Sequence, residues 1–127
     1  MPIDDQHHAT DLARAREVLG AAGAAGLERR PWQHPGQPAS DADLVRFAAW
    51  SARTPDTAPE VLAAGLRLLA SARAEFDQIE AGLLFAARGA GMTWPQIADA
   101  LDLGSAQAAQ QRLNRVLARV GHPASES

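Results

Sequence analysis

Apolar residues recur along the chain three or four positions apart, which is the spacing of one helix face, and no stretch alternates like a strand. We therefore expect an all-α fold of about five helices. The first is predicted over residues 12–19, after a disordered stretch at residues 1–8. The second is predicted to open at Ser40 or Asp41 and to end near Arg53. Its expected buried residues are Leu44, Phe47 and Ala48, with Trp50 in the core or at an interface.

The longest predicted helix has Thr57 as its expected cap and Pro59 in its first turn, where the missing N–H of proline is harmless. No breaker precedes Gly82 and the pattern continues to about Gly89, so this central helix is up to ~30 residues and ~45 Å long. Two interpretations stay open: a helix around which the shorter ones pack, or a dimer formed along its apolar seam. The seam consists of Leu62, Leu66, Leu69, Phe76, Ile79 and Leu83.

Two segments between these helices are poor in regular structure. Repeated glycine in GAAGAAG, residues 20–26, weakens helical continuation, and three prolines exclude a helix from residues 28–40. The second segment is either a disordered linker or an extended arm whose Arg29, Arg30 and Trp32 reach a DNA minor groove.

The C-terminal quarter carries strong helix-start signals. Thr93 and Gln96 have the spacing of a capping box, and Met92 and Ile97 that of a hydrophobic staple, so a two-turn helix is predicted over residues 94–101. In the following turn Leu103 is expected to enter the core, Gly104 to adopt a left-handed backbone and Ser105 to cap a helix over residues 106–120. The expected inward residues are Trp94, Ile97, Ala98 and Leu101 in the shorter helix, and Ala106, Ala109, Leu113, Val116, Leu117 and Val120 in the longer one.

The outward face of the last helix is free of acidic residues. It holds Gln107, Ala108, Gln111, Arg112, Asn114, Arg115 and Arg119. Gln and Asn amides can pair with adenine edges, Arg with guanine or phosphate, and the helix N-terminus with a phosphate oxygen. The alternative is an ordinary solvated helix face. The predicted DNA-binding residues are Thr93, Ser105, Gln107, Ala108, Gln111, Arg112, Asn114 and Arg115.

The composition narrows the class of protein. The net charge of −3 gives no general attraction to polyanions, although it permits a local basic face. All 12 basic residues are Arg, which makes forked contacts with phosphate and guanine. The absence of Cys excludes disulfides and zinc fingers, and no apolar run approaches the roughly 20 residues of a membrane span.

The sequence predicts neither a catalytic nor a metal site. The four histidines lack the i, i+4 helical spacing and the acidic partners of a metal site. No Cys or Lys nucleophile, phosphate-cradling Gly-rich loop or serine elbow is present. We expect no enzyme activity and no cofactor, and no small-molecule ligand is identified. The acidic Glu75, Asp77 and Glu80 are assigned to solvation or to a partner surface.

GMTWPQIADALDLGSAQAAQQRLNRV, residues 91–116, resembles the helix-turn-helix of small actinomycete transcriptional regulators. The approximate pattern is G-x-[ST]-W-x-x-I-A-x-A-L-G-L-x-S-x-Q-A-A-x-x-R, and some proteins that carry it regulate a small heat-shock protein. The chain departs from the pattern at Asp102, where Gly is usual. Its turn is also one residue longer than that of the best-known helix-turn-helix proteins. The resemblance implies that the second helix enters the major groove.

The expected organisation has four parts: residues 1–40 with a tail, a short helix and the Pro-rich linker, 41–90 as a helical scaffold or dimerisation region, 91–121 as the helix-turn-helix, and 122–127 as a tail. We predict a transcriptional regulator that reads double-stranded DNA through residues 106–120 as a homodimer. Its expected location is the cytoplasm, in association with the nucleoid. The alternative is a helical interaction module that keeps the helix-turn-helix fold and binds RNA polymerase or another regulator.

Overall fold

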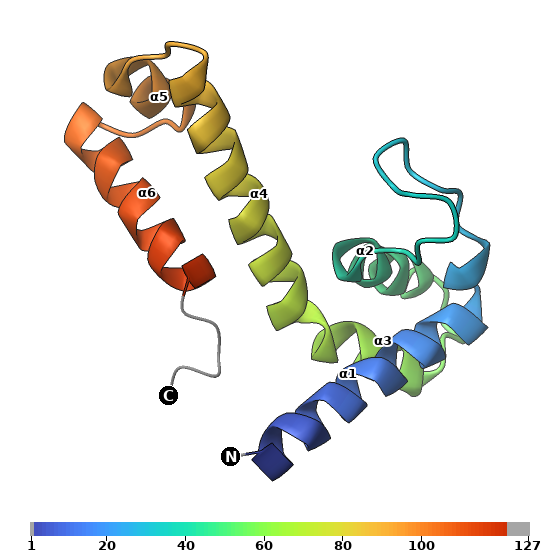
Figure 1. Ribbon diagram of the computed structural model, residues 1–127. Helices are drawn as coiled ribbons and strands as arrows, with labels where there is room; N and C mark the ends of the chain where they lie inside the picture. Colours follow the sequence, from blue (N-terminus) through green and yellow to red (C-terminus); the bar gives the residue numbers. More distant parts are fainter. Residues whose placement is uncertain (1, 122–127) are drawn as a thin grey trace. The chain divides into compact units, whose positions relative to one another are not determined.

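The computed structural model describes residues 2–121, with side chains from residue 5 onward, and this part of the chain is helical with no strand (Figure 1). The predicted all-α class is confirmed. The predicted tails at residue 1 and residues 122–127 lie outside the described range. The elements are α1 Pro2–Ala22, the 3-10 helix η1 Ala24–Gly26, α2 Asp41–Ser51, α3 Pro59–Arg67, α4 Leu69–Gly89, α5 Trp94–Ala100 and α6 Ala106–Gly121.

The chain forms two compact units, which are described separately. Unit 1 ends at Arg73 and unit 2 begins at Ala74, so α4 contributes residues to both. The four-part division predicted from the sequence stays a prediction. None of the helices within residues 2–121 is both long enough and apolar enough to cross a membrane.

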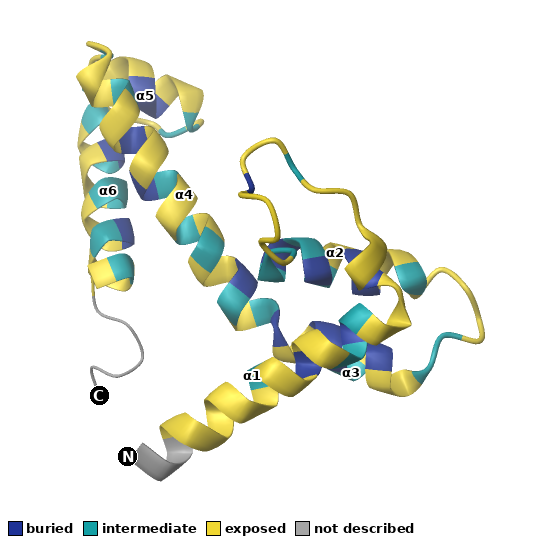
Figure 2. Cartoon of the chain, turned by 45° about the vertical axis from the view of Figure 1, so that its right-hand side comes forward, coloured by how far each residue is buried: buried dark blue, intermediate teal, exposed yellow. Residues whose placement is uncertain are grey.

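The core of unit 1 forms where α1, α2 and α3 pack together (Figure 2). Leu19 and Leu68 are fully buried there, and Gly65 lets α3 approach α2, because a Cβ at this position would lie 2.6 Å from the Cβ of Ala48. Apolar burial of this kind is the main force that holds short helices together. The buried cluster is Ala15, Leu19, Ala24, Leu44, Phe47, Ala48, Val61, Ala64 and Leu68.

Helix α1 begins ten residues earlier than the sequence predicts, at Pro2 instead of residue 12, and the predicted disorder at residues 2–8 is wrong. Proline is compatible with the first turn of a helix, and no Gly or further Pro occurs before Gly20. The helix ends before Gly23, whose φ of 136° is accessible only to glycine. The weak helical tendency of GAAGAAG therefore marks the real end of α1.

Residues 27–40 form an ordered loop, so the disordered-linker interpretation is wrong. Gln33 is 8% exposed; its side-chain oxygen accepts a hydrogen bond from the Arg30 amide (2.6 Å) and its side-chain NH₂ donates to the Pro38 carbonyl (3.0 Å). The Arg30 guanidinium also contacts the Asp43 carboxylate at 3.3 Å, which ties the loop to α2. A buried amide with both ends satisfied fixes a loop that carries little apolar surface.

Helix α2 begins as predicted, because Ser40 is its N-cap and the Ser40 hydroxyl accepts a hydrogen bond from the Asp43 amide at 3.2 Å. Leu44, Phe47 and Ala48 are buried as expected. Trp50 is not in the core: it is 61% exposed, with its ring 5.9 Å from that of Phe47.

The predicted long helix is interrupted at Leu68, which separates α3 from α4. Leu68 takes a turn conformation that leaves its side chain fully buried, so the break serves the core although no Gly or Pro marks it. Thr57 is not the cap: Ala58 is the N-cap of α3, and the Thr57 hydroxyl bonds to the Ser51 carbonyl instead.

The apolar seam does not form the core. Its members Leu62, Leu66, Phe76, Ile79 and Leu83 are between 38% and 68% exposed, whereas α4 buries Ala81 and Leu84 on its other side. The packing interpretation of the seam is therefore wrong for these five residues. Dimerisation along it stays a prediction.

Candidate nucleic-acid interface

Helices α5 and α6 pack on each other and on the end of α4 around a small apolar cluster within unit 2 (Figure 2). Leu84, Ile97, Ala98 and Ala109 are buried in it, and Val116 is fully buried further along α6. The predicted inward faces of both helices are confirmed. The partly buried residues around the cluster are Ala87, Met92, Trp94, Leu101, Leu103 and Leu113.

The start of α5 is fixed by hydrogen bonds that the sequence predicts. The Thr93 hydroxyl accepts from the Gln96 amide (3.2 Å), and the Gln96 side chain accepts from the Thr93 amide (2.8 Å), which completes the capping box. Arg88 adds a link that the sequence does not predict: its guanidinium donates to the Met92 carbonyl at 2.8 Å and lies 4.9 Å from the centre of the Trp94 ring.

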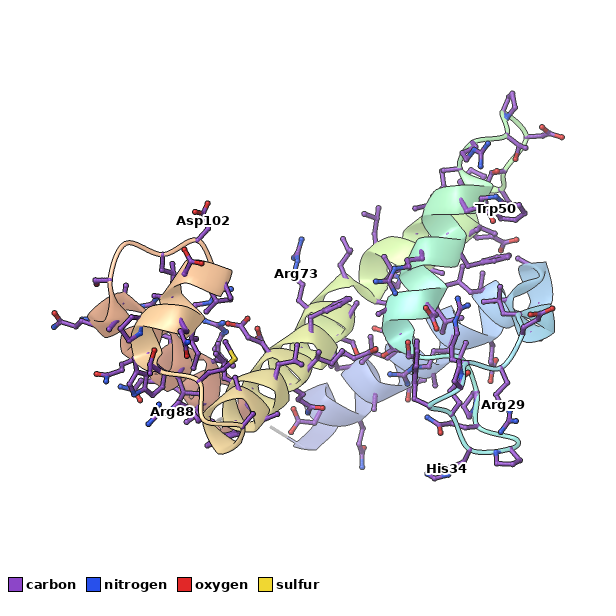
Figure 3. All side chains as sticks on the ribbon, turned by 90° about the horizontal axis from the view of Figure 1, so that it is seen from above. Arg29, His34, Trp50, Arg73, Arg88 and Asp102 are labelled. Carbon is purple, nitrogen blue, oxygen red and sulfur yellow. The ribbon has the colours of Figure 1, made fainter. Side chains whose placement is uncertain are left out.

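The turn between α5 and α6 differs from the prediction in its left-handed residue. Asp102 has a φ of 57°, and Gly104 is not among the residues with positive φ. Two hydrogen bonds close the end of α5 around Asp102, from its own amide to the Asp99 carbonyl (3.0 Å) and from the Leu103 amide to the Ala98 carbonyl (2.8 Å). The Asp102 carboxylate is exposed and points away from the helices (Figure 3). A residue in this position is usually glycine.

Ser105 caps α6 as predicted, because its hydroxyl accepts a hydrogen bond from the Ala108 amide at 3.1 Å. The same hydroxyl is thereby engaged with the backbone. Ser105 and Thr93 are both exposed at helix N-termini, where the unpaired amides of a first turn favour anions. Neither first turn contains an acidic side chain.

Two arginines of α6 are ion-paired with α4, which corrects the predicted outward face. Arg112 Nε lies 2.6 Å from Glu80 Oε2 and Arg112 Nη2 lies 3.3 Å from Glu80 Oε1, and Arg119 makes the same forked contact with Asp77 at 3.0 and 3.3 Å. The Glu80 hydrogen bonds raise the pKa of Arg112 above its usual value. Asp77 and Glu80 therefore hold α6 against α4 and are not the solvated or partner-binding acids that the sequence indicates.

The remaining outward face of α6 is rich in amides. Gln107, Gln111, Asn114 and Arg115 are exposed, as predicted for a reading face, and Ala108 is half-buried at its edge. Gln110, which is not among the predicted residues, is also exposed and lies next to Asn114 at the edge of this face. Helical periodicity is the signal that would have placed it there. The face thus offers four amide side chains and one guanidinium, with no carboxylate on α6 itself.

The charge of unit 2 is low. Its described residues include the four arginines 88, 112, 115 and 119 and the five acids 75, 77, 80, 99 and 102, a formal charge of 4 − 5 = −1. Since Arg112 and Arg119 are paired with acids, Arg115 is the α6 cation that makes no ion pair within the described residues. The affinity of this face for a polyanion therefore gains little from the net charge of unit 2.

The described part of the chain contains no group of three or more His, Asp or Glu side chains placed to hold a metal ion. Comparison with protein-family models, with curated proteins and with solved structures gave no match to this chain.

Proposed function

We propose that the chain is a DNA-binding transcriptional regulator in which α5, the turn and α6 act as a helix-turn-helix. The observation that carries this proposal is the exposed face of α6, which combines Gln107, Gln111, Asn114 and Arg115 with no acidic residue. A packed α5 and a capped N-terminus hold this face in a fixed orientation. A major-groove reader requires such a rigid helix with its polar side chains free.

The chemistry of the face favours particular base pairs. Gln and Asn can bond in a bidentate manner to adenine N6 and N7, and Arg115 to guanine or to a phosphate. The small side chain of Ala108 permits close approach of the backbone to base edges. We therefore expect a recognition sequence rich in A·T pairs. Arg112 is assigned a positioning role, because its guanidinium is occupied by Glu80.

One such motif would bind weakly, since it offers few positive charges and affinity depends strongly on phosphate neutralisation. A homodimer on two half-sites doubles the contacts and supplies the missing affinity. Because each copy neutralises few phosphates, the logarithm of the binding constant should fall with the logarithm of salt concentration by only about 0.9 per phosphate contacted. A shallow salt dependence separates this mode of binding from a generally basic protein.

The proposal is tested by selection of binding sites from random duplexes, followed by mobility-shift titration of the selected site. Arg115→Gln and Gln111→Ala should each weaken binding by about 1–3 kcal/mol and relax the preference at one base position. Arg67→Gln, at an exposed arginine in the last turn of α3, is the matched control and should leave affinity unchanged. Selection that enriches no sequence at low salt would refute the proposal.

A protein-interaction module remains the alternative, and one observation favours it. Phe76, Ile79 and Leu83 are exposed at i, i+3 and i+7 on α4, where they form an apolar stripe within unit 2. Under this alternative a partner such as RNA polymerase or another regulator covers the stripe. Arg115→Glu discriminates the two functions, because it should abolish DNA binding under the first and leave partner capture intact under the second.

A further inference from the structure

A hollow of about 600 Å³ lies beside Trp50 in unit 1, at the ends of α1 and α2. Its apolar wall consists of Leu27, Phe47 and Trp50, and the two aromatic rings are 5.9 Å apart. Trp50, labelled in Figure 3, is 61% exposed and Leu27 is 38% exposed, so their apolar surfaces are open to a ligand. This volume and an aromatic lining are typical of small-molecule sites.

The GAAGAAG segment creates the space. Ala22, Gly23 and Gly26 line the hollow and contribute almost no side-chain volume. Gly23 also passes close to the Phe47 ring, since an added Cβ would lie 3.2 Å from Phe47 Cζ. Larger residues at these positions would fill the space that the aromatic wall leaves open.

The charged residues at the hollow favour an anion. Arg30 and Arg46 line it together with a single acid, Asp43, which bonds to both guanidinium groups at 3.3 and 3.2 Å. Two positive charges against one leave a net charge of +1 among the lining residues. A second hollow of about 490 Å³ shares Ala22, Trp50 and Ser51 with the first, and its one charged lining residue is Arg53.

We propose that the hollow beside Trp50 binds a small apolar carboxylic acid. The hydrocarbon or aromatic part of the ligand packs on Trp50, Phe47 and Leu27, and its carboxylate lies at Arg30, which contacts Asp43 through Nε. Guanidinium groups suit this task because they bond to both oxygens of a carboxylate and remain charged. The proposal concerns unit 1 alone and does not depend on DNA binding by α6.

The test uses the full chain and 4-phenylbutyrate as the probe, with ¹H–¹⁵N NMR as the readout. Saturable shifts are expected in the Trp50 indole N–H and in the amides of residues 22–27, with a Kd on the order of 1 mM or tighter for a ligand of this size. The indole signal is assigned with Trp50→Phe. The uncharged amide of the same acid should bind at least about tenfold more weakly. Equal affinity for acid and amide, or no saturable shift at these residues, would overturn the proposal.

Gly26→Leu locates the site. A Cβ at Gly26 meets no atom within 4 Å, so the new side chain can enter the hollow without displacing the core, and we expect at least about a tenfold loss of affinity. Gly20→Leu is the matched control, because Gly20 also has open space around it but does not line the hollow. Trp50→Ala, at an exposed position, provides a second blocking variant if Gly26→Leu does not fold. Wild-type affinity in a folded blocking variant would overturn the assignment.

Discussion

Units 1 and 2 differ in how much apolar packing holds their helices in place. In unit 1 the buried cluster contains nine side chains, among them Leu19 and Leu68 with no exposed surface. The corresponding cluster within the described part of unit 2 contains four, two of which are alanines. Both units contain helix caps and ion pairs, and beside its smaller core unit 2 has the capping box at Thr93, the Ser105 cap and the ion pairs of Arg112 and Arg119.

The difference has a consequence for α6. A helix held by one narrow apolar side and two ion pairs can leave the rest of its surface polar and open, whereas α2 and α3 in unit 1 bury a larger share of their residues in packing. Gln107, Gln111, Asn114 and Arg115 are free because the small cluster does not need them. The comparison predicts that the loss of a buried side chain costs more in unit 1 than in unit 2, and that the helix ends of unit 2 are sensitive to substitution.

The largest effect is expected from Leu68→Ala, which should lower the free energy of unfolding by about 2–5 kcal/mol, because it leaves a cavity at the break between α3 and α4. Val116→Ala, at the fully buried position in unit 2, removes less apolar volume and should cost about 2 kcal/mol. Urea unfolding followed by circular dichroism measures both.

Leu66→Ala is the control for this pair, since Leu66 lies on α3 but is 68% exposed. It should change the free energy of unfolding by no more than about 0.5 kcal/mol. A loss at Leu66 equal to that at Leu68 would mean that the core of unit 1 is not where the contacts place it.

The close approach of α2 and α3 predicts opposite effects for two glycine substitutions. Gly65→Ala places a methyl group 2.6 Å from the Cβ of Ala48 and should destabilise the fold by about 1–3 kcal/mol through overpacking. Gly82→Ala on α4 has open space around the new Cβ and should stabilise the helix by about 0.5–1 kcal/mol. Both values come from the same unfolding titration, and effects of equal sign would contradict the packing described for Gly65.

Asp102→Gly tests the helix ends of unit 2. Glycine relieves the left-handed backbone at φ 57° and removes a negative charge from the C-terminal end of α5, so the fold should gain up to about 1 kcal/mol. If α6 reads DNA, the same variant should bind the selected duplex more tightly. Asp102→Asn separates the two causes, because it removes the charge while the side chain remains. A loss of stability in Asp102→Gly would show that the carboxylate itself supports the turn.

The helix caps and the inward helix faces of unit 2 are the features that the sequence predicts best, because they depend on residues close together in the chain. Thr93 with Gln96, the Ser105 cap and the inward faces of α5 and α6 are all confirmed. Ser40 at the start of α2 is correct for the same reason. The DNA-binding role of the exposed residues stays a prediction, since a free polar face does not by itself identify its ligand.

The features that the sequence does not predict depend on contacts between residues far apart in the chain. The contacts of Arg112 and Arg119 cross 32 and 42 positions to Glu80 and Asp77, and helical periodicity of α6 alone contains no sign of them. The break at Leu68 leaves its side chain fully buried in the core of unit 1, and no Gly or Pro marks it in the sequence. Gly104 was the natural choice for a left-handed residue, but α5 ends early enough that Asp102 takes this conformation.

The smallest predicted effect concerns acid stability and is confined to unit 1. Hydrogen bonds from Arg16, at 2.8 Å to each oxygen, are the main reason that the pKa of Asp41 lies below its ordinary value, and a hydrogen bond from Ser71 acts in the same direction against the opposing effect of burial.

Because the folded-state pKa of Asp41 is below that of the unfolded chain, about 3.9, this group stabilises the fold above that pH. The contribution is lost as the pH falls through the lowered pKa. Asp41→Asn should therefore be less stable than the wild type near neutral pH, and the difference between the two proteins should shrink as the pH falls below the unfolded-state pKa of about 3.9. Urea midpoints at a series of pH values measure it. Asp56→Asn, at an exposed loop position, should follow the wild type throughout. A difference between Asp41→Asn and the wild type that stays constant with pH would mean that the Arg16–Asp41 contact does not form in solution.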